Sequence, residues 1–233
     1  MDRQVNLDIL GTTEIFRGAP ASVLADIRAL AMRKTLGAGE PLFRQGDPAS
    51  MFYIVLSGRL RVTQTTSDGQ QIIIRYLGPG ESAGYTALYG GDCHPGTATA
   101  LDVTELLGWS SAIIADIMSK HPTIAMNAVA VLGTRYHDMQ VRLRELSTEK
   151  VERRIAHTIL RLAQQAGRRT ARGIEIAFPL SRQDLAEMAG TTLHTVSRTL
   201  SAWEEQGLVG SGRRRVIVYK MDALTAIAEE DRD

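Results

Sequence analysis

Cysteine, net charge and long apolar runs are all scarce in this chain of 233 residues, and each scarcity excludes a class of protein. The single cysteine, Cys93, rules out an internal disulfide and an iron–sulfur cluster held by several thiolates of one chain. No apolar run approaches the ~20 residues of a membrane helix. The N-terminal MDRQVNLDIL lacks the basic start and apolar core of a signal peptide. We therefore expect a cytoplasmic protein that does not enter a membrane.

Charge is nearly balanced over the whole chain but not along it. The formal net charge is +1. Residues 150–220 hold 13 Lys and Arg against 6 Asp and Glu, whereas residues 1–149 hold 13 against 15. A positive surface gathered in one region is the electrostatic footprint of a nucleic-acid-binding domain. The length fits two modest domains, and 44% hydrophobic residues are enough for a core in each.

Residues 181–209 are typical of two short helices joined by a tight turn; they read SRQDLAEMAGTTLHTVSRTLSAWEEQGLV. Ser181 and Asp184 have the spacing of a capping box at the start of the first helix. Gly190 suits a left-handed position between steeply crossing helices, and Thr192 can cap the second helix. This pattern predicts a helix-turn-helix that binds DNA.

The second of these helices has two faces and is expected to end at Gly207. Steps of three and four residues predict a buried stripe of Leu193, Val196, Leu200 and Trp203. The opposite face carries His194, Ser197, Arg198 and Ser201. Because a recognition helix contacts bases with its first turns, Arg198 is predicted to donate to guanine O6 and N7. Ser197 allows a close approach, Thr192 can bind phosphate at the helix N-terminus, and His194 can meet a base or a phosphate.

A basic run follows the second helix. Arg213, Arg214 and Arg215 lie between Gly212 and an alternating apolar pair, as a wing hairpin requires. We include Arg213 and Arg214 among the predicted DNA contacts. The alternative, a solvated polar face beside a core stripe, is common for short polar patterns. It leaves both the basic run and the uneven charge without an explanation.

Residues 36–110 differ from the C-terminal part of the chain. Short alternating stretches are separated by glycines, and these stretches are Phe52–Leu56, Leu60–Val62 and Ile72–Ile74. Short strands between glycine turns indicate a β-roll or a β-sandwich.

A long helix is predicted between these two regions. Its apolar residues alternate steps of four and three over three heptads: Ala125, Val129, Leu132, Tyr136, Met139, Leu143 and Leu146. Such a helix can pack on its own β domain or against a second chain. We favour dimerisation, because a two-fold reader needs a symmetric helix to place two recognition helices one DNA turn apart.

Along nearly its whole length, the chain resembles the CRP/FNR family of bacterial transcription regulators. The resemblance is carried by FRQGDPASMFYIVLSGRLRV (43–62), GPGE (78–81), VERRIAHTIL (151–160) and SRQDLAEMAGTTLHTVSRTL (181–200). It implies an α+β chain with a cyclic-nucleotide-binding-like sensor β-roll and flanking helices (1–121), a dimerisation helix (122–149) and a winged helix-turn-helix (150–233). It also implies a homodimer on an inverted repeat of double-stranded DNA, with RNA polymerase as a further partner.

The resemblance breaks at the effector site. Cyclic-AMP receptors of the family use a glutamate for the ribose and an arginine for the phosphate, and the matching positions here are Tyr85 and His94 or its neighbour Pro95. Met139 and Gln140 stand where such receptors have Thr and Ser for the adenine. Without an arginine fork for the phosphate, the sequence argues against cyclic AMP as the effector.

The sequence does not identify the inducing signal. Some family sensors bind haem or respond to nitric oxide, and Cys93, His94, His121 and His137 invite that interpretation. A Cys–His pair in a glycine-rich loop is more often structural, however, and the sequence requires no cofactor. The candidate effector pocket comprises Tyr85, Cys93, His94 and Met139, with a haem-dependent nitric oxide sensor as the alternative function.

The reader motif places the chain near one side of the family. His194-Thr195-Val196-Ser197-Arg198 stands where Glu-Thr-Val-Ser-Arg is typical, and it resembles the FNR, FixK, DNR and NnrR group. That group implies TTG half-sites mirrored by CAA, and an activator in a nitrogen-oxide or low-oxygen response such as denitrification. Loss of the glutamate removes an acceptor for cytosine N4, so we expect altered specificity at one base pair.

β-Roll folds also host metal-dependent dioxygenases, but His94 alone among five histidines falls in the predicted β region, and no nucleophile–base set is present. We therefore expect no enzyme.

The predicted loop from Ala166 to Gly173, before a strand at Ile174–Phe178, corresponds to one that touches RNA polymerase in the family, although it also fits an exposed basic turn.

Overall fold

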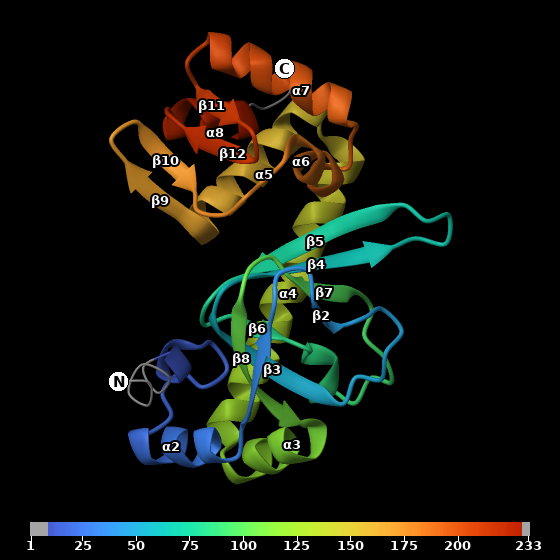
Figure 1. Cartoon of the computed structure of the whole chain (residues 1–233), viewed down its shortest axis with the longest axis vertical. Coiled ribbons are helices and arrows are strands. Elements are labelled where there is room, and N and C mark those ends of the chain that lie inside the picture. The colour runs from blue at the N-terminus through green and yellow to red at the C-terminus, as the bar shows by residue number, and fades with distance from the viewer. Residues whose placement is uncertain (1–8, 230–233) are drawn as a thin grey trace. The chain divides into compact units, whose positions relative to one another are not determined.

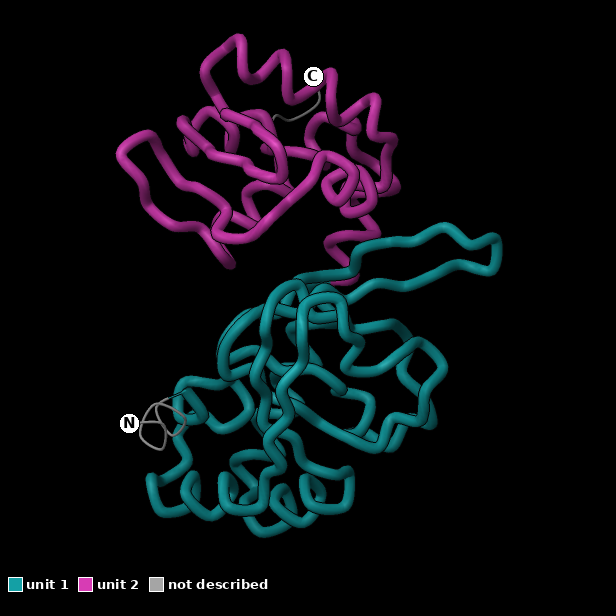
Figure 2. Tube along the Cα trace, in the orientation of Figure 1, with its two compact units in different colours: residues 1–138 teal, residues 139–233 magenta. Residues whose placement is uncertain are grey.

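The computed structural model describes residues 9–229 and divides into two compact units, residues 1–138 (unit 1) and residues 139–233 (unit 2), as Figure 2 shows. Both units combine helices with antiparallel sheets, which confirms the predicted α+β class. No helix within residues 9–229 combines the length and the apolarity that crossing a membrane requires.

Unit 1 is built on two antiparallel four-stranded sheets (Figure 1). One has the order β1 (Met32–Leu36), β8 (Thr104–Ser110), β3 (Met51–Ser57), β6 (Ser82–Ala83). The other has the order β2 (Pro41–Phe43), β7 (Thr97–Ala100), β4 (Leu60–Thr65), β5 (Gln71–Leu77). Since neighbours in each sheet are mostly distant in sequence, the chain passes back and forth between the sheets, as the predicted β-roll requires.

Strand β3 is buried on both faces, and this corrects the expected alternation over Phe52–Leu56. Phe52 and Ile54 lie in a core with helices α2 (Ala21–Ala29), α3 (Ser111–Lys120) and α4 (Pro122–Thr148). Tyr53 and Val55 lie in a second core between the two sheets. A strand with apolar neighbours on both sides becomes a continuous apolar run, so the period of two is lost. In β5 the alternation is present, because Ile73 is buried while Ile72 and Ile74 are exposed.

Helix α4 carries apolar residues on two faces. Ile124, Ala128 and Val131 are 2%, 5% and 5% exposed, and the first two pack into the core of unit 1. The heptad residues lie elsewhere on the helix, and the exposed ones are Val129 at 61%, Tyr136 at 64%, Met139 at 70%, Leu143 at 67% and Leu146 at 47%. Ala125 and Leu132 are partly buried. In unit 1 the helix therefore packs mainly through Ile124 and Ala128, while most of the predicted seam stays exposed.

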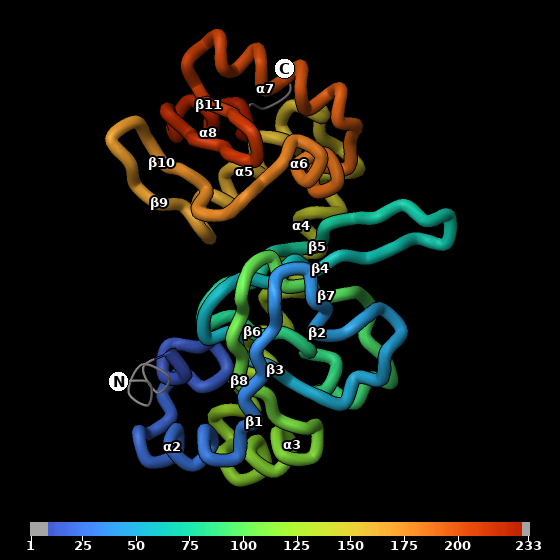
Figure 3. Tube along the Cα trace, viewed as in Figure 1, coloured from blue at the N-terminus to red at the C-terminus, as the bar shows by residue number. Residues whose placement is uncertain are grey.

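Unit 2 begins at Met139, within α4, and the run of colour in Figure 3 traces the order of the elements that follow. Its elements are α5 (Val151–Ala166), β9 (Gly167–Thr170), β10 (Gly173–Ile176), α6 (Arg182–Ala189), α7 (Leu193–Glu205), β11 (Val209–Gly212), β12 (Arg215–Val218) and α8 (Met221–Glu229). The strands form one antiparallel sheet in the order β11, β12, β10, β9. A large part of α5 is buried, including Ile155, Ile159 and Leu162, so this helix lies at the centre of the unit.

The segment from Ala166 to Gly173 was expected to be a loop, and this was wrong. It forms strand β9 and a two-residue turn, with Gly167 opposite Ile176 and Thr170 opposite Gly173. Arg168 on β9 pairs with Glu175 on β10 at 3.2 Å, and opposite charges on facing strands stabilise a hairpin. The following strand ends at Ile176 rather than at Phe178.

Candidate nucleic-acid interface

Helix α6 begins with the predicted capping box. The Ser181 hydroxyl accepts from the Asp184 amide at 3.0 Å, and the Asp184 carboxylate accepts from the Ser181 amide at 2.7 Å. The helix ends at Gly190, whose φ of +61° is left-handed and whose amide donates to the Ala186 carbonyl. Both ends of this short helix thus have their polar backbone groups satisfied. We call residues 189–191 the reader turn.

Helix α7 follows the reader turn directly. The Thr192 hydroxyl caps it by accepting from the Thr195 amide at 3.2 Å, and Gly207, with a φ of +65°, lies just beyond its end. Val196, Leu200 and Trp203 are buried as predicted, but Leu193 is 47% exposed, so its assignment to the buried stripe was wrong. Leu193 is the first residue of α7, and side chains on a helix lean toward its N-terminus. Its side chain is therefore exposed, because no preceding helical turn lies there to pack against it.

The polar side of α7 forms what we call the outer face, made up of Thr192, His194, Ser197, Arg198 and Ser201. Thr192, His194, Arg198 and Ser201 are exposed, and Ser197 is partly buried. Helical periodicity brings the last four to one side, opposite the buried stripe. Within residues 9–229, neither Arg198 nor His194 has a hydrogen bond or an ion pair, so both side chains are free to meet a ligand.

A hairpin of β11 and β12 forms the predicted wing, with Arg213 and Arg214 in its turn and both exposed. Arg214 has a φ of +59° and is the one non-glycine residue with positive φ in the described part of the chain. Its carbonyl accepts from the Leu180 amide at 3.0 Å. The turn is therefore fixed to the segment that leads into α6, in spite of the strained backbone.

Two carboxylates hold the wing in place. Glu204, near the end of α7, accepts from the Ser211 amide at 2.6 Å and pairs with Arg182 of α6 at 3.5 Å. Glu175 accepts from Arg215 at 2.5 Å and from Arg168 at 3.2 Å. The hydrogen bond from Arg215, followed by that from Arg168, holds the pKa of Glu175 below its ordinary value. Of the three wing arginines, Arg215 thus already forms an ion pair within the protein, with Glu175.

The candidate effector residues of unit 1 have different surroundings. Cys93 is exposed. His94 is 3% exposed and stacks on Phe43 with ring centroids 3.7 Å apart, and burial lowers the pKa of its imidazole. Tyr85, in the 3₁₀-helix η1 (Tyr85–Leu88), packs edge-on to Phe52. The fourth candidate, Met139, belongs to unit 2 and is 70% exposed.

A polar cluster beside Tyr85 was not anticipated. Arg75 pairs with Glu81 at 2.9 Å, and Arg135 pairs with Glu14 at 3.5 Å. These residues come from three distant parts of the sequence, around positions 14, 75–85 and 135, so no spacing pattern signals them. The guanidinium groups nearest Tyr85 are already paired with carboxylates of the chain itself. In the described residues no group of three His, Cys, Asp or Glu side chains that could hold a metal ion is found.

Comparison with known proteins extends these observations. Residues 33–121 match the description of a cyclic nucleotide-binding domain, and residues 153–227 match a Crp-like helix-turn-helix domain. The cyclic AMP receptor protein of Thermus thermophilus is 33% identical over 196 residues, which cover 84% of this chain and 88% of that protein. The nitrogen fixation regulation protein FixK of Azorhizobium caulinodans is 28% identical over 207 residues, covering 88% and 81%.

Solved structures give the same fold. FixK2 from Bradyrhizobium japonicum matches with a TM-score of 0.76 and 24% identity over 87% of this chain and 99% of that chain. The catabolite activator protein of Thermus thermophilus matches with a TM-score of 0.55 and 31% identity, covering 93% and 98%. Both domains of the chain, in the same order, are thus similar to those of proteins named as regulators or activators.

Proposed function

Because the chain belongs to the CRP/FNR family of DNA-binding transcription regulators, we propose that it acts as a homodimer on an inverted repeat of TTG/CAA-type half-sites. Its relatives and its matched domains are those of regulators and not of enzymes. A DNA-binding regulator works where the chromosome is, so we place it in the cytoplasm.

The outer face of α7 carries this proposal. Arg198 is exposed and unpaired among the described residues, two turns from a capped helix N-terminus, and its fork geometry matches guanine O6 and N7. Arg213 and Arg214 extend from the wing as a second set of charges suited to phosphates. We assign base contact to Arg198, Ser197 and His194, and phosphate contact to Thr192 and the wing arginines.

Dimerisation is supported by the exposed stripe on α4. Val129, Tyr136, Met139 and Leu143 are more than 60% exposed, although large apolar side chains in a row are costly to leave in water. Their alternating steps of four and three match a two-stranded coiled coil. A partner helix of a second copy would cover them and supply the two-fold symmetry that an inverted repeat demands.

The names of the relatives point to different signals. The name of the Thermus relative suggests cyclic AMP, but the residues here do not fit that ligand. At the position of the phosphate-binding arginine, His94 is buried against Phe43 with a lowered pKa, and Arg75 and Arg135 are paired with carboxylates. We therefore propose that the protein does not depend on cyclic AMP.

We propose instead a role in nitrogen-oxide or low-oxygen regulation, as an activator that contacts RNA polymerase. The names of several relatives support this: the fumarate and nitrate reduction regulatory protein of Salmonella typhimurium, the transcriptional activator FnrA of Stutzerimonas stutzeri and FixK. The exposed arginines of the β9–β10 hairpin offer a surface for polymerase. Haem is not part of this proposal, since an exposed Cys93 and a stacked, buried His94 do not favour a ligand pair.

The test is a titration of the purified protein, without effector, against a TTG/CAA inverted repeat and a scrambled duplex at one fixed salt concentration. Specific binding by such proteins exceeds non-specific binding by ~10³-fold or more. We expect selective binding of that order, unchanged by added cyclic AMP. Equal affinity for both duplexes, with selectivity appearing when cyclic AMP is added, would contradict the proposal.

A further inference from the structure

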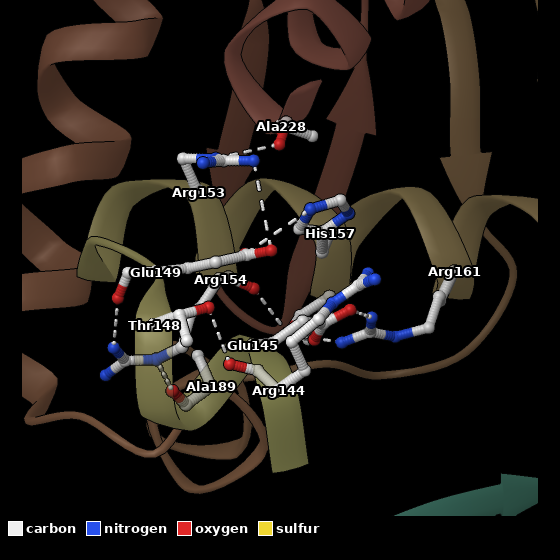
Figure 4. Close-up of polar contacts among 11 residues, drawn as sticks. Arg144, Glu145, Thr148, Glu149, Arg153, Arg154, His157, Arg161, Ala189 and Ala228 are labelled. Carbon is white, nitrogen blue, oxygen red and sulfur yellow. Dashed lines mark hydrogen bonds and ion pairs between the residues drawn. The ribbon is translucent and has the colours of Figure 1, made fainter. Parts of the chain in front are cut away.

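One guanidinium connects the end of α4 to the reader turn (Figure 4). Arg154, on α5, donates to the Glu149 carbonyl at 2.9 Å, to the Ala189 carbonyl at 3.0 Å and to the Gly190 carbonyl at 3.0 Å. The Glu149 amide donates to Glu145, so its carbonyl extends the C-terminal end of α4. Ala189 and Gly190 form the C-terminal end of α6. Arg154 thus satisfies the free carbonyls of two helix ends at once, where a cation also meets the negative ends of both dipoles.

A direct apolar contact joins the same two places. A Cβ atom at Gly190 would lie 2.7 Å from Cδ2 of Leu146, so this side chain of α4 lies against the reader turn. Leu146 is the last residue of the predicted dimer seam, and it is 47% exposed where Leu143 is 67% exposed. The final turn of α4 therefore contacts the reader turn through a side chain as well as through Arg154.

Ion pairs fix the end of α4 to α5 (Figure 4). Glu145 is 3% exposed and accepts from Arg161 at 2.6 Å. The Glu149 side chain is 8% exposed and lies 3.4 Å from Nε2 of His157 and 3.9 Å from Arg153. Breaking a buried pair leaves a charge without compensation, which is strongly unfavourable. The end of α4, the start of α5 and the reader turn are therefore held in one arrangement.

We propose that Arg154 is the positioning residue that fixes the direction of α7 relative to the last turns of α4. Helix α7 starts three residues after Gly190, and the intervening turn has both ends hydrogen-bonded, so its carbonyl contacts set where the helix begins. A displacement of α4 is passed to the recognition helix through these bonds. The DNA part of this inference rests on the proposed function, in which α7 reads an inverted repeat. Arg154 itself binds protein carbonyls and is not assigned a contact to DNA.

Arg153 provides a matched control. It is the neighbouring residue on α5, it is partly buried like Arg154, and it also lies close to Glu149. Its hydrogen bond, however, runs to the Ala228 carbonyl of α8 at 2.9 Å. Substitutions at Arg153 therefore remove a similar side chain from the same helix while leaving the hydrogen bonds to the reader turn intact. Because Arg153 also pairs with Glu149, the two positions are compared on segment 186–193 and not on the end of α4.

The first test needs no DNA. Amide hydrogen exchange is measured for the full chain and for Arg154→Gln, Arg154→Lys, Arg153→Gln and Arg153→Lys. Losing charge-assisted bonds to the carbonyls should speed exchange in segments 143–150 and 186–193 by ~10-fold or more for Arg154→Gln. Arg154→Lys should give a smaller increase, because lysine keeps the charge but not the fork. The buried segment 155–163 should be unchanged, which separates this effect from general loosening of the unit.

The second test uses inverted repeats whose half-sites are set at the preferred spacing, or one base pair closer or farther. The spacing preference is the ratio of the affinities for the preferred and the altered spacing. We expect this ratio to be ~10-fold smaller in Arg154→Gln than in the wild type, while the affinity for a scrambled duplex stays the same. The Arg153 variants should keep that preference. If Arg154→Gln does not fold, Arg154→Lys serves in both tests with smaller changes of the same direction.

The two proposals fail in distinguishable ways. A wild-type protein without preference for the inverted repeat would contradict the proposed function, while the exchange experiment would still decide the role of Arg154. Wild-type exchange in segment 186–193 of both Arg154 variants would overturn the inference, and so would equal acceleration of that segment by the Arg153 variants. Retention of the full spacing preference by an Arg154 variant would overturn it as well.

Discussion

The imidazole of His94 lies flat on the ring of Phe43 in the glycine-rich part of unit 1, at an angle of 10° between the rings. Its amide donates to the Asp47 carbonyl, and its carbonyl accepts from the Gly46 amide, so both backbone groups are bonded to the loop between β2 and β3. A residue placed in this way supports the β-roll and has little freedom to bind an effector. The ring stacking and the two backbone hydrogen bonds therefore favour a structural role for His94.

Acid should destabilise unit 1 through this histidine. Burial lowers the pKa of His94 in the folded chain, so the unfolded chain binds the proton more readily. Stability is then full above the ordinary pKa of about 6.5 and falls as the pH drops through that value toward the folded pKa. We expect the thermal midpoint to fall between pH 7 and pH 5 and the slope to flatten in His94→Gln. His137→Gln, at an exposed position, should keep the wild-type slope; an equal flattening there would contradict this account.

The thiol of Cys93 is exposed and pairs with no other cysteine, because the sequence has one. Cys93→Ser should therefore bind DNA in reducing buffer with an affinity within ~2-fold of the wild-type value, as expected for a surface substitution. Anisotropy titrations of both proteins under identical salt provide the measurement. A large loss of affinity in the serine variant would mean that the thiol takes part in the active state.

At the scale of elements, the helix-turn-helix could be predicted closely from the sequence. Its caps, its glycine and its stripe are local, since Ser181 reaches Asp184 and Thr192 reaches Thr195 without help from the rest of the fold. The β9–β10 hairpin could not be predicted in the same way. Its sequence is polar and basic, and its stability comes from Glu175, which pairs with arginines on both neighbouring strands. Strand β3 does not show the expected alternation of buried and exposed residues, because its burial on both faces depends on the packing of the whole unit.

The proposed dimer should dissociate when the exposed stripe of helix α4 is charged. Leu143→Asp places a carboxylate in the middle of the proposed seam, and like charges would then face each other across the two-fold axis. We expect sedimentation to report a monomer at micromolar concentration, with affinity for the inverted repeat lowered at least ~10-fold because two half-sites are no longer bound together. Val103→Asp, an equally exposed apolar position outside α4, should remain dimeric. A dimeric Leu143→Asp variant would rule out this seam.

The β9–β10 hairpin should matter more for transcription than for DNA binding. Arg169 and Arg172 are exposed, whereas Arg168 is paired with Glu175. The double variant Arg169→Ala, Arg172→Ala should therefore keep its DNA affinity within ~3-fold while transcription in vitro falls further, because two surface charges contribute little to fold stability. Parallel losses of DNA affinity and transcription would assign these arginines to DNA instead of polymerase.

At the scale of the whole molecule, the domain order could be inferred from motifs, but the contacts that make the parts act together could not. Arg154 meets Glu149, Ala189 and Gly190, and the last two are more than 30 residues away in sequence. Arg135 likewise lies beside Glu81 and Tyr85, which are about 50 residues away in sequence. Such sets depend on tertiary packing and leave no periodic signal, although the arginines themselves are visible in the sequence.

In the proposed function, the outer face of α7 reads a base sequence and Arg198 reads the guanine. The direct measurement is a binding cycle of wild type and Arg198→Ala against the TTG/CAA repeat and a repeat with that guanine–cytosine pair replaced. A bidentate contact of this kind contributes ~1–3 kcal/mol of discrimination. We predict that the wild type loses this much on the altered repeat, whereas Arg198→Ala binds both repeats equally and weakly. An Arg198→Ala variant that keeps the wild-type discrimination would contradict the account.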